Sequence, residues 1–186
     1  MLKAFGTAFG LTFIAELGDK TQLAVLTLSA RYGWVPTFLG AALAFVILDG
    51  LAVTVGELLA RFVPTDIIRY VSAAIFIVFG ILSFLPSREK EPEAPTSTRK
   101  PFLTALVYIG LMELGDKTQL SMVALTSRFK MPVWVFLGGT IALILSAFIG
   151  AIVGKYLGHY LPIKWIRWIS GVIFIVFGIL IAVGVT

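Results

Sequence analysis

The chain has no cysteine, a single histidine and few charged residues. Without cysteine it can form neither a disulfide nor a thiolate metal site. One histidine, His159, is too few to build a zinc or copper site of the usual His and Cys type. Only 13% of the 186 residues are charged, whereas 59% are hydrophobic. A soluble domain of this size would expose a very large apolar surface, so the composition predicts a protein of the lipid bilayer.

The formal net charge of +5 does not indicate a nucleic-acid partner. The Lys and Arg residues lie mostly in short connectors between apolar runs, and they form no basic face. We interpret them as charges that orient the chain in the membrane. An enzyme is not indicated either, because the sequence contains no nucleophile with a base, no zinc triad and no nucleotide-binding loop. No cofactor is therefore expected.

Six apolar runs fit the length needed to cross about 30 Å of hydrocarbon. The predicted transmembrane helices cover residues 3–29, 35–60, 68–85, 102–127, 133–155 and 165–184. The first run could be mistaken for a signal peptide, but it is long enough to cross a bilayer, so we keep it as a helix of the mature protein. The predicted fold class is an all-α membrane protein with six transmembrane helices.

The sequence contains an internal duplication. The octapeptide ELGDKTQL at residues 16–23 recurs at 113–120, and IFIVFGIL at 75–82 recurs at 173–180. These matches predict a first three-helix repeat at 1–85 and a second at 102–186, joined by a charged, Pro-rich linker at 86–101. A unit with an odd number of spans that occurs twice in one chain must be inverted the second time. Inverted repeats are typical of secondary transporters, whose substrate site lies near the bilayer midplane where the repeats meet.

The duplicated octapeptide carries acidic residues inside apolar spans. Glu16 and Asp19 are three residues apart on a predicted helix, so both side chains leave the same face, and Glu113 and Asp116 repeat this spacing. An ionisable group at the centre of a spanning helix costs about 2.5 to 3.5 kcal/mol. Four such groups would cost on the order of 10 kcal/mol if nothing paired with them. Bound protons or a hard divalent cation such as Ca²⁺, Mn²⁺ or Mg²⁺ would offset that cost.

Two lysines in the octapeptides are expected charge partners of these acids. Lys20 and Lys117 follow Glu16 and Glu113 by four residues, the favourable order for an ion pair along one helix. Such pairs alone would describe two internally neutralised helices packed for stability. Because each copy has two carboxylates for one lysine, negative charge is left over, and a divalent cation would balance it.

The remaining polar residues of the octapeptides have two readings each. Glycines 18 and 115 permit either a break in the helix, which would free carbonyl oxygens as ligands, or ordinary close packing of helices. The side chains of four other residues are additional candidate ligands, although a threonine can also satisfy its hydroxyl on its own helix. They are Thr21, Gln22, Thr118 and Gln119.

Asp49 is an acidic residue without a counterpart, because the second repeat has Ala147 at the aligned position. A lone carboxylate near the membrane midplane is a candidate proton carrier or a fifth ligand. The alternative is that Asp49 lies nearer the interface or pairs with a lysine.

In these residues the chain resembles the Gdt-type manganese/calcium cation exchangers. That family carries two copies of a Glu-x-Gly-Asp-(Lys/Arg)-(Thr/Ser) motif in six core helices. The motif stands here as ELGDKT at 16–21 and 113–118, and the resemblance covers essentially the whole chain. It implies export of Mn²⁺, Ca²⁺ or both from the cytoplasm in exchange for protons. The cation ligands that it implies are Glu16, Asp19, Glu113 and Asp116.

A proton-coupled carrier also agrees with the chemistry of the residues themselves. Burial favours the protonated carboxyl and a bound cation favours the ionised one, so cation entry expels protons. Two rival functions remain open: export of a small organic cation such as a basic amino acid, and a passive cation channel lined by the acids. Paired oxygens suit a bare ion better than an organic cation, and inverted duplication favours a carrier over a channel.

The expected location is the plasma membrane of a prokaryote. The resemblance implies this compact form, since the additional amino-terminal segment of eukaryotic members is not part of this sequence. With both termini outside, the cytoplasmic connectors hold eight basic residues against five on the other side, which favours that orientation. The sequence leaves the oligomeric state open, with a homodimer among the options.

Overall fold

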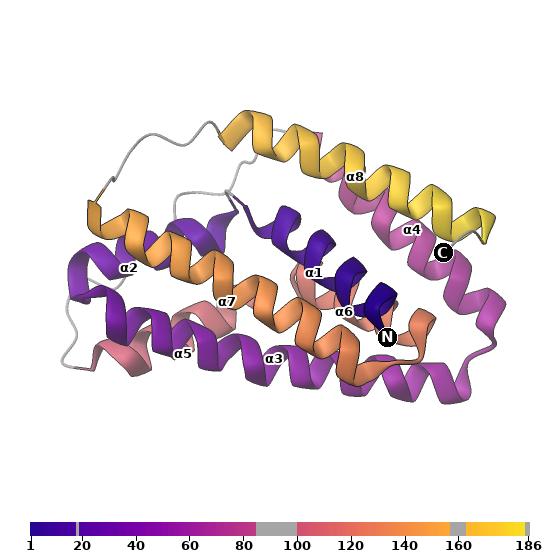
Figure 1. The fold of residues 1–186 in the computed structure, drawn as a ribbon, viewed down its shortest axis with the longest axis horizontal. Helices are drawn as coiled ribbons and strands as arrows, with labels where there is room; N and C mark the ends of the chain where they lie inside the picture. Colours follow the sequence, from indigo (N-terminus) through magenta and orange to yellow (C-terminus); the bar gives the residue numbers. More distant parts are fainter. Residues whose placement is uncertain (18, 85–99, 157–162, 185–186) are drawn as a thin grey trace.

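The computed structural model describes residues 1–17, 19–84, 100–156 and 163–184, and all regular structure within them is helical (Figure 1). The predicted linker, His159 and Gly18 therefore fall largely or wholly outside the described residues. The helices are α1 (Leu2–Glu16), α2 (Lys20–Tyr32), α3 (Trp34–Phe62), α4 (Thr65–Phe84), α5 (Pro101–Glu113), α6 (Lys117–Phe129), α7 (Pro132–Tyr156) and α8 (Ile163–Val183).

Two of the six predicted continuous helices are wrong, because each is broken in two at the duplicated octapeptide. The run predicted at 3–29 forms α1 and α2, and the run predicted at 102–127 forms α5 and α6. The remaining predicted helices correspond to α3, α4, α7 and α8 within a few residues at each end. Apolar periodicity conceals the breaks because the helix resumes after only three residues.

The described residues on either side of the two breaks make the same backbone contacts. The amide of Asp19 donates to the carbonyl of Glu16 at 3.1 Å, and Asp116 donates to Glu113 at 3.0 Å. Both aspartates are extended residues at the start of the following helix. Gly115 has a φ of +79°, a conformation that glycine adopts without steric cost, and no atom lies within 4 Å of the position of an added Cβ. Gly115 therefore breaks the helix rather than providing a close packing contact.

Helices of one copy pack on helices of the other copy. α1 packs against α7 and α5 packs against α3, while α2 packs against α7 and α6 packs against α3. Two equivalent glycines mark these contacts. A Cβ on Gly138 would lie 2.4 Å from the carbonyl oxygen of Phe5, and one on Gly40 would lie 2.5 Å from that of Phe102. Each of these contacts that a helix of the first copy makes with the second copy therefore has an equivalent contact in which the two copies are exchanged.

Equivalent long helices of the two copies run in opposite directions. In Figure 1, α4 and α8 lie side by side, and they contact the other helices mainly through α6 and α1. Gly80 approaches Gly171 and Gly178 approaches Ala73, so residue numbers rise along α4 while they fall along α8. α3 and α7 are likewise antiparallel, because Asp49 contacts Thr140 whereas Phe38, eleven residues earlier, contacts Phe148.

The buried apolar residues form two clusters on either side of the helix breaks. One cluster contains the inner residues of α1 and α6, including Ala8 and Met122. The other contains those of α2 and α5, including Val25 and Ile109. Because α1 joins α2 and α5 joins α6 at the octapeptides, these polar segments lie between the two clusters.

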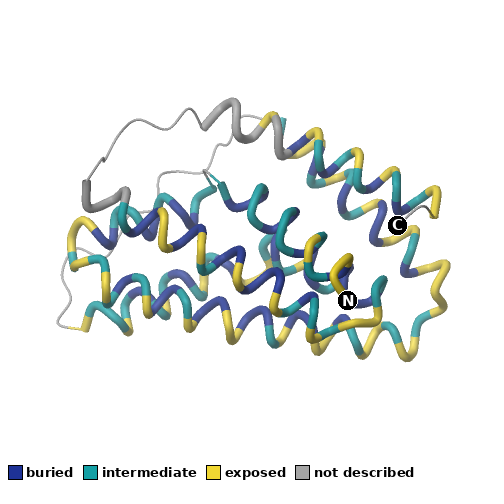
Figure 2. The backbone as a smooth tube through the Cα atoms, viewed as in Figure 1, coloured by how far each residue is buried: buried dark blue, intermediate teal, exposed yellow. Residues whose placement is uncertain are grey.

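The outer surface is strongly apolar. Exposed positions recur along the outer side of α3 (Figure 2), and they include Leu39, Leu43, Val46, Ile47, Leu51, Val55 and Leu58. Among the described residues, three helical stretches are long and apolar enough to cross a membrane, at Trp34–Phe62, Thr65–Leu82 and Pro132–Ile152. An apolar surface of this kind is favourable against lipid, because its exposure to water would be energetically unfavourable.

Candidate cation site

The two glutamates of the octapeptides are buried at the helix breaks. Glu16 is the last residue of α1 and Glu113 is the last residue of α5, and their exposed fractions are only 1% and 2%. Glu16 lies within electrostatic range of Glu113, Asp19 and Asp116. The fold therefore brings the four predicted acids of the two copies into one region, although they are 97 residues apart in sequence.

The two lysines pair with the aspartates of the opposite copy. Lys20 Nζ lies 3.0 Å from Asp116 Oδ1, and Lys117 Nζ lies 2.9 Å from Asp19 Oδ2. The predicted pairing along one helix with Glu16 and Glu113 is wrong, because the chain breaks between each glutamate and its lysine. The lysines are nevertheless charge partners of the site, and their ion pairs connect the starts of α2 and α6.

Glu113 is held by two threonine hydroxyls. Thr118 of the same copy donates to its Oε2 at 2.8 Å, and Thr21 of the first copy donates to its Oε1. Both threonines are buried. Both of the predicted threonines therefore take part in the site, and in this conformation they orient a carboxylate.

Glu16 is different, because neither of its carboxylate oxygens has a hydrogen-bond partner among the described residues. It is nevertheless more deeply buried than any other acid of the site. A buried carboxyl without a partner is costly unless it is protonated or binds a cation. Glu16 is therefore the acid best placed to accept a proton or a cation.

The two predicted glutamines lie in different surroundings. The side-chain amide of Gln22 is buried and donates toward Ser146, with the hydroxyl oxygen at 3.3 Å and the carbonyl oxygen at 3.4 Å. Gln119 uses its side-chain oxygen to accept a hydrogen bond of 2.6 Å from the backbone amide of Gly115. Gln22 therefore joins α2 to α7, whereas Gln119 stabilises the local break.

Asp49 is buried on α3 and accepts a hydrogen bond of 2.8 Å from the hydroxyl of Thr140 on α7. No lysine or arginine forms an ion pair with it within the described part of the chain, and it does not lie at the surface. It interacts electrostatically with Glu113. The structure therefore gives no support to the alternative in which Asp49 pairs with a lysine, and the depth of Asp49 in the membrane stays a prediction.

Thr140 and Ser146 on α7 are not among the predicted site residues, yet their hydroxyl groups contact Asp49 and Gln22. Their counterparts in the first repeat are Ala42 and Leu48, so the duplication draws no attention to them. The only available signal was the presence of hydroxyl groups inside an otherwise apolar run.

In this conformation no three acidic or histidine side chains of the described ranges are close enough together to hold one metal ion. Two of the four acids, Asp19 and Asp116, are instead engaged by lysines. The arrangement offers two buried glutamates, two lysine-bound aspartates and several hydroxyl and amide oxygens. Oxygen groups of this kind bind protons and hard divalent cations.

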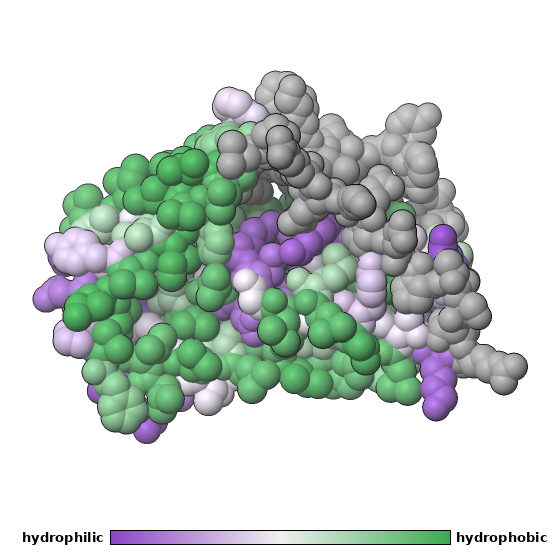
Figure 3. All heavy atoms as spheres, turned by 180° about the vertical axis from the view of Figure 1, so that it is seen from behind, coloured by the Kyte–Doolittle hydropathy of each residue, from purple (hydrophilic) through white to green (hydrophobic). Residues whose placement is uncertain are grey.

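The ion pairs are partly accessible. The side chains of Lys20 and Asp116 are 27% and 14% exposed, and those of Lys117 and Asp19 are 23% and 16% exposed. Figure 3 shows hydrophilic atoms near the middle of one face, with hydrophobic atoms to the left of them and below them. The lysines and aspartates therefore retain access to the outside, unlike the two glutamates behind them.

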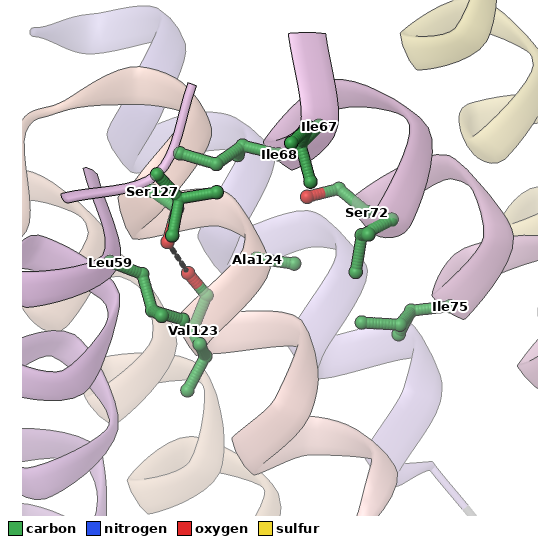
Figure 4. A pocket seen from close by; sticks show the side chains of 10 residues that line it. Leu59, Ile67, Ile68, Ser72, Ile75, Val123, Ala124 and Ser127 are labelled. Atoms are coloured by element: carbon green, nitrogen blue, oxygen red, sulfur yellow. Dashed lines mark hydrogen bonds between the residues drawn. The ribbon is translucent and has the colours of Figure 1, made fainter. Parts of the chain in front are cut away.

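A separate cavity of about 230 Å³ lies between α3, α4 and α6 (Figure 4). Its lining is apolar except for Ser72 and Ser127, and the hydroxyl of Ser127 lies within hydrogen-bond distance of the carbonyl oxygens of Val123 and Gly56. Because it has no charged lining residue, this cavity does not suit a bare cation.

The profile of one protein family matches nearly the whole chain. It is described as the divalent cation/proton antiporter GDT1, and it matches residues 4–91 and 101–186. The chain therefore belongs to the GDT1 family of divalent cation/proton antiporters, which confirms the resemblance inferred from the duplicated motif. The transported species of this family are divalent cations and protons.

Individual relatives agree with this assignment. A proposed manganese exporter of Vibrio cholerae serotype O1 is 29% identical over 164 residues, which cover 87% of this chain and 82% of that protein. GDT1-like protein 5 of Arabidopsis thaliana is 25% identical, with 96% of this chain and 95% of the relative covered. A GDT1-like protein of Synechocystis is 27% identical, with 96% of both chains covered. No solved structure matches the chain.

Proposed function

We propose that this protein exports Mn²⁺, Ca²⁺ or both from the cytoplasm in exchange for protons, and that the cation binds to Glu16, Asp19, Glu113 and Asp116. One observation carries the ligand assignment. The crossed ion pairs, at 3.0 Å and 2.9 Å, join the acidic motif of each copy to the other, so the acids of both copies serve one site. The similarity to a proposed manganese exporter supports Mn²⁺ as a substrate.

The chain crosses the membrane six times as two inverted repeats, at 1–85 and 102–186, on either side of the linker at 86–101. Two observations support this topology. Equivalent long helices are antiparallel, as inversion requires. In addition, α1, α2, α5 and α6 have only 13 to 15 residues, or about 20 to 22 Å each, so each is too short to cross alone. Each pair of half-helices forms one broken span, with the acids at the break.

Exchange follows from what the carboxylates can bind. A carboxylate holds either a proton or a share of a divalent cation, and not both, so a cation that enters the site releases protons and protons that enter release the cation. Thr21 and Thr118 orient Glu113 for this purpose, and the side-chain oxygens of Gln22 and Gln119 are additional candidate ligands after rearrangement. Alternation of the site between the two membrane faces completes an antiport cycle.

Asp49 serves as a proton carrier in this scheme. Five helices pack against α3, and among the charged groups that the structure describes on them, Glu113 of α5 acts electrostatically on Asp49. Because Asp49 has a neutral hydroxyl as its hydrogen-bond partner, it can gain or lose a proton without breaking an ion pair.

The remaining proposals concern location. We place the protein in the plasma membrane of a prokaryote with both termini outside. This orientation puts the larger number of basic connector residues in the cytoplasm. Figure 1 shows both ends of the described chain toward the same end of the molecule, as an even number of crossings requires. A homodimer is compatible with this arrangement.

The test is ion exchange in sealed liposomes that contain the purified protein and an internal pH-sensitive dye. Mn²⁺, Ca²⁺ and Mg²⁺ are added in turn to wild type, to Asp116→Asn and to the control Glu57→Gln, which removes an exposed acid paired with Arg61. We expect Mn²⁺ or Ca²⁺ to drive protons in the opposite direction, with loss of this exchange in Asp116→Asn only.

Other outcomes would favour the rival functions. Cation flux without proton movement would indicate a channel. Exchange of protons for a basic amino acid, with no response to any divalent cation, would indicate an exporter of organic cations.

A further inference from the structure

We propose that Lys20 and Lys117 act as internal counter-ions that a divalent cation must displace, so that they weaken cation binding and link it to separation of the two acidic motifs. This inference rests on the proposed function, because it takes Asp19 and Asp116 as cation ligands. It assigns to the lysines a role in affinity and turnover beyond that of charge balance.

The crossed geometry is the first support. Each lysine lies within 3.0 Å of an aspartate of the other copy. Lys20 directly follows Asp19 in the chain, and Lys117 directly follows Asp116, so the two ion pairs form a double connection between the starts of α2 and α6. A cation that takes up the aspartate oxygens that now face the two ammonium groups displaces both lysines. Its entry at those oxygens breaks both connections.

The charges of the exchanging groups match. Two ammonium groups carry two positive charges, the same as one divalent cation, so one divalent ion can compensate both aspartates when both lysines withdraw. A monovalent cation replaces only one lysine and leaves one aspartate uncompensated. The crossed pairs thereby favour divalent over monovalent substrates.

The lysines also have a route of withdrawal. Their side chains are 27% and 23% exposed, so the ammonium groups are not sealed in the apolar interior. A lysine side chain is long and flexible, and it can move its charge into water while its aliphatic part stays in place. Glu16 and Glu113, which are buried, remain at the site to receive the cation.

The first experiment measures Mn²⁺ binding to the full-length protein in lipid nanodiscs, with free Mn²⁺ quantified by electron paramagnetic resonance. The variants are Lys20→Gln, Lys117→Gln and the charge-retaining Lys20→Arg and Lys117→Arg. The matched control is Arg61→Gln, which removes the cation of an exposed ion pair elsewhere. Removal of a partly exposed competitor worth about 1 kcal/mol gives about fivefold tighter binding in the Gln variants. We expect the Arg variants and Arg61→Gln to bind as wild type does.

The same variants are compared in proton-coupled exchange at saturating Mn²⁺. We expect Lys20→Gln and Lys117→Gln to turn over more slowly, because the released site lacks the counter-ion that reconnects the copies. Gln variants that bind Mn²⁺ no more tightly than wild type overturn the inference. If wild type itself binds no Mn²⁺ or Ca²⁺, the proposed function fails and the inference fails with it.

A second experiment needs no variant and therefore does not depend on how the variants fold. The wild-type protein is treated with an amine-reactive reagent with and without Mn²⁺, and the labelling of each lysine is measured by mass spectrometry. We expect Mn²⁺ to increase the labelling of Lys20 and Lys117, with Lys3 and Lys130 as unchanged references. Equal labelling with and without Mn²⁺, in protein that binds Mn²⁺, overturns the inference.

Discussion

The two copies of ELGDKTQL have the same sequence and interrupt the helix at the same position, yet their glutamates lie in different surroundings. Glu113 accepts hydrogen bonds from Thr21 and Thr118, whereas Glu16 has no hydrogen-bond partner among the described residues. In a symmetric arrangement each glutamate would have received one threonine of its own copy. Two identical peptides therefore adopt two states of hydrogen bonding within one molecule.

The neighbours that differ between the copies supply a reason for this asymmetry. Only the first repeat has the acid Asp49 on its long helix, and only the second has the hydroxyls of Thr140 and Ser146 on its own. Gln22 donates toward Ser146, while Gln119 has no equivalent hydroxyl and contacts the backbone of Gly115. The duplicated motif therefore provides the acids, whereas residues outside the motif determine the hydrogen bonds that each acid makes.

The largest expected effect comes from replacing either glutamate by glutamine. We expect Glu16→Gln and Glu113→Gln each to lower cation/proton exchange at least about tenfold, because both acids serve one site. The same two variants should differ in stability. Glu113→Gln leaves a threonine without its acceptor and should lose about 1 to 3 kcal/mol, whereas Glu16→Gln removes an unpartnered buried carboxyl and should lose none.

The measurements are exchange in liposomes and thermal unfolding in detergent. Equal loss of stability in the two variants would contradict the asymmetry, and full exchange by either variant would exclude that glutamate from the site.

The next largest effect concerns the glycine contacts between helices, which are equivalent in the two copies. Gly40→Val and Gly138→Val each place side-chain atoms against a backbone carbonyl of the other copy. We expect both to destabilise the protein, by about 1 to 3 kcal/mol and to a similar extent, because the contacts are equivalent. Gly10→Ala is the control, since nothing lies within 4 Å of its added Cβ. Thermal unfolding checks this, and a strong effect in only one valine variant would show that the two contacts are not equivalent.

The third effect concerns Asp49, the acid present in one copy only. We expect Asp49→Asn to bind Mn²⁺ as wild type does but to exchange it for protons about tenfold more slowly or worse, because a proton carrier is lost. Thr140→Val keeps the acid and removes its hydrogen-bond donor, so it should have a smaller effect in the same direction. Binding and exchange are measured on the same preparations. Loss of Mn²⁺ binding in Asp49→Asn would instead make Asp49 a ligand.

The smallest effect concerns the two threonines that hold Glu113. Thr21→Val and Thr118→Val each remove one hydrogen bond to a buried carboxylate, and each should cost about 1 to 2 kcal/mol of stability. Thr12→Val is the matched control, because the hydroxyl of Thr12 is buried without a partner in the described structure and the second copy has Ile109 at that position. We expect this control to lose no stability in thermal unfolding. A loss in Thr12→Val equal to the others would mean that the hydroxyl contacts of Glu113 have no special value.

Much of this molecule could be predicted from its sequence, because duplication and hydropathy are properties of the chain itself. The helical membrane class and the importance of the two acidic motifs follow from them. The predicted pairing of Lys20 with Glu16 failed because a spacing of four residues indicates a contact only while the helix continues. The break after Glu16 depends on three residues whose apolar neighbours favour helix on both sides.

Other features depended on contacts between the copies. The pairing of Lys117 with Asp19 joins segments that are almost 100 residues apart, and nothing in either segment specifies the partner. The octapeptides themselves cannot predict that Glu113 rather than Glu16 accepts hydrogen bonds from both threonines, because the two octapeptides are identical. Packing of the whole bundle decides it.

The exchanged packing of the half-helices has a consequence for movement. Gly138 fixes α1 closely to α7, and Gly40 fixes α5 closely to α3, so each half-helix that ends in a glutamate is attached to the long helix of the other repeat. In the proposed transport cycle, we therefore expect the bodies that move against each other to combine helices of both repeats. Displacement of α7 carries Glu16, and displacement of α3 carries Glu113 and Asp49 together. A substitution that changes the movement of the long helix in one repeat should therefore change the position of the glutamate that belongs to the other repeat.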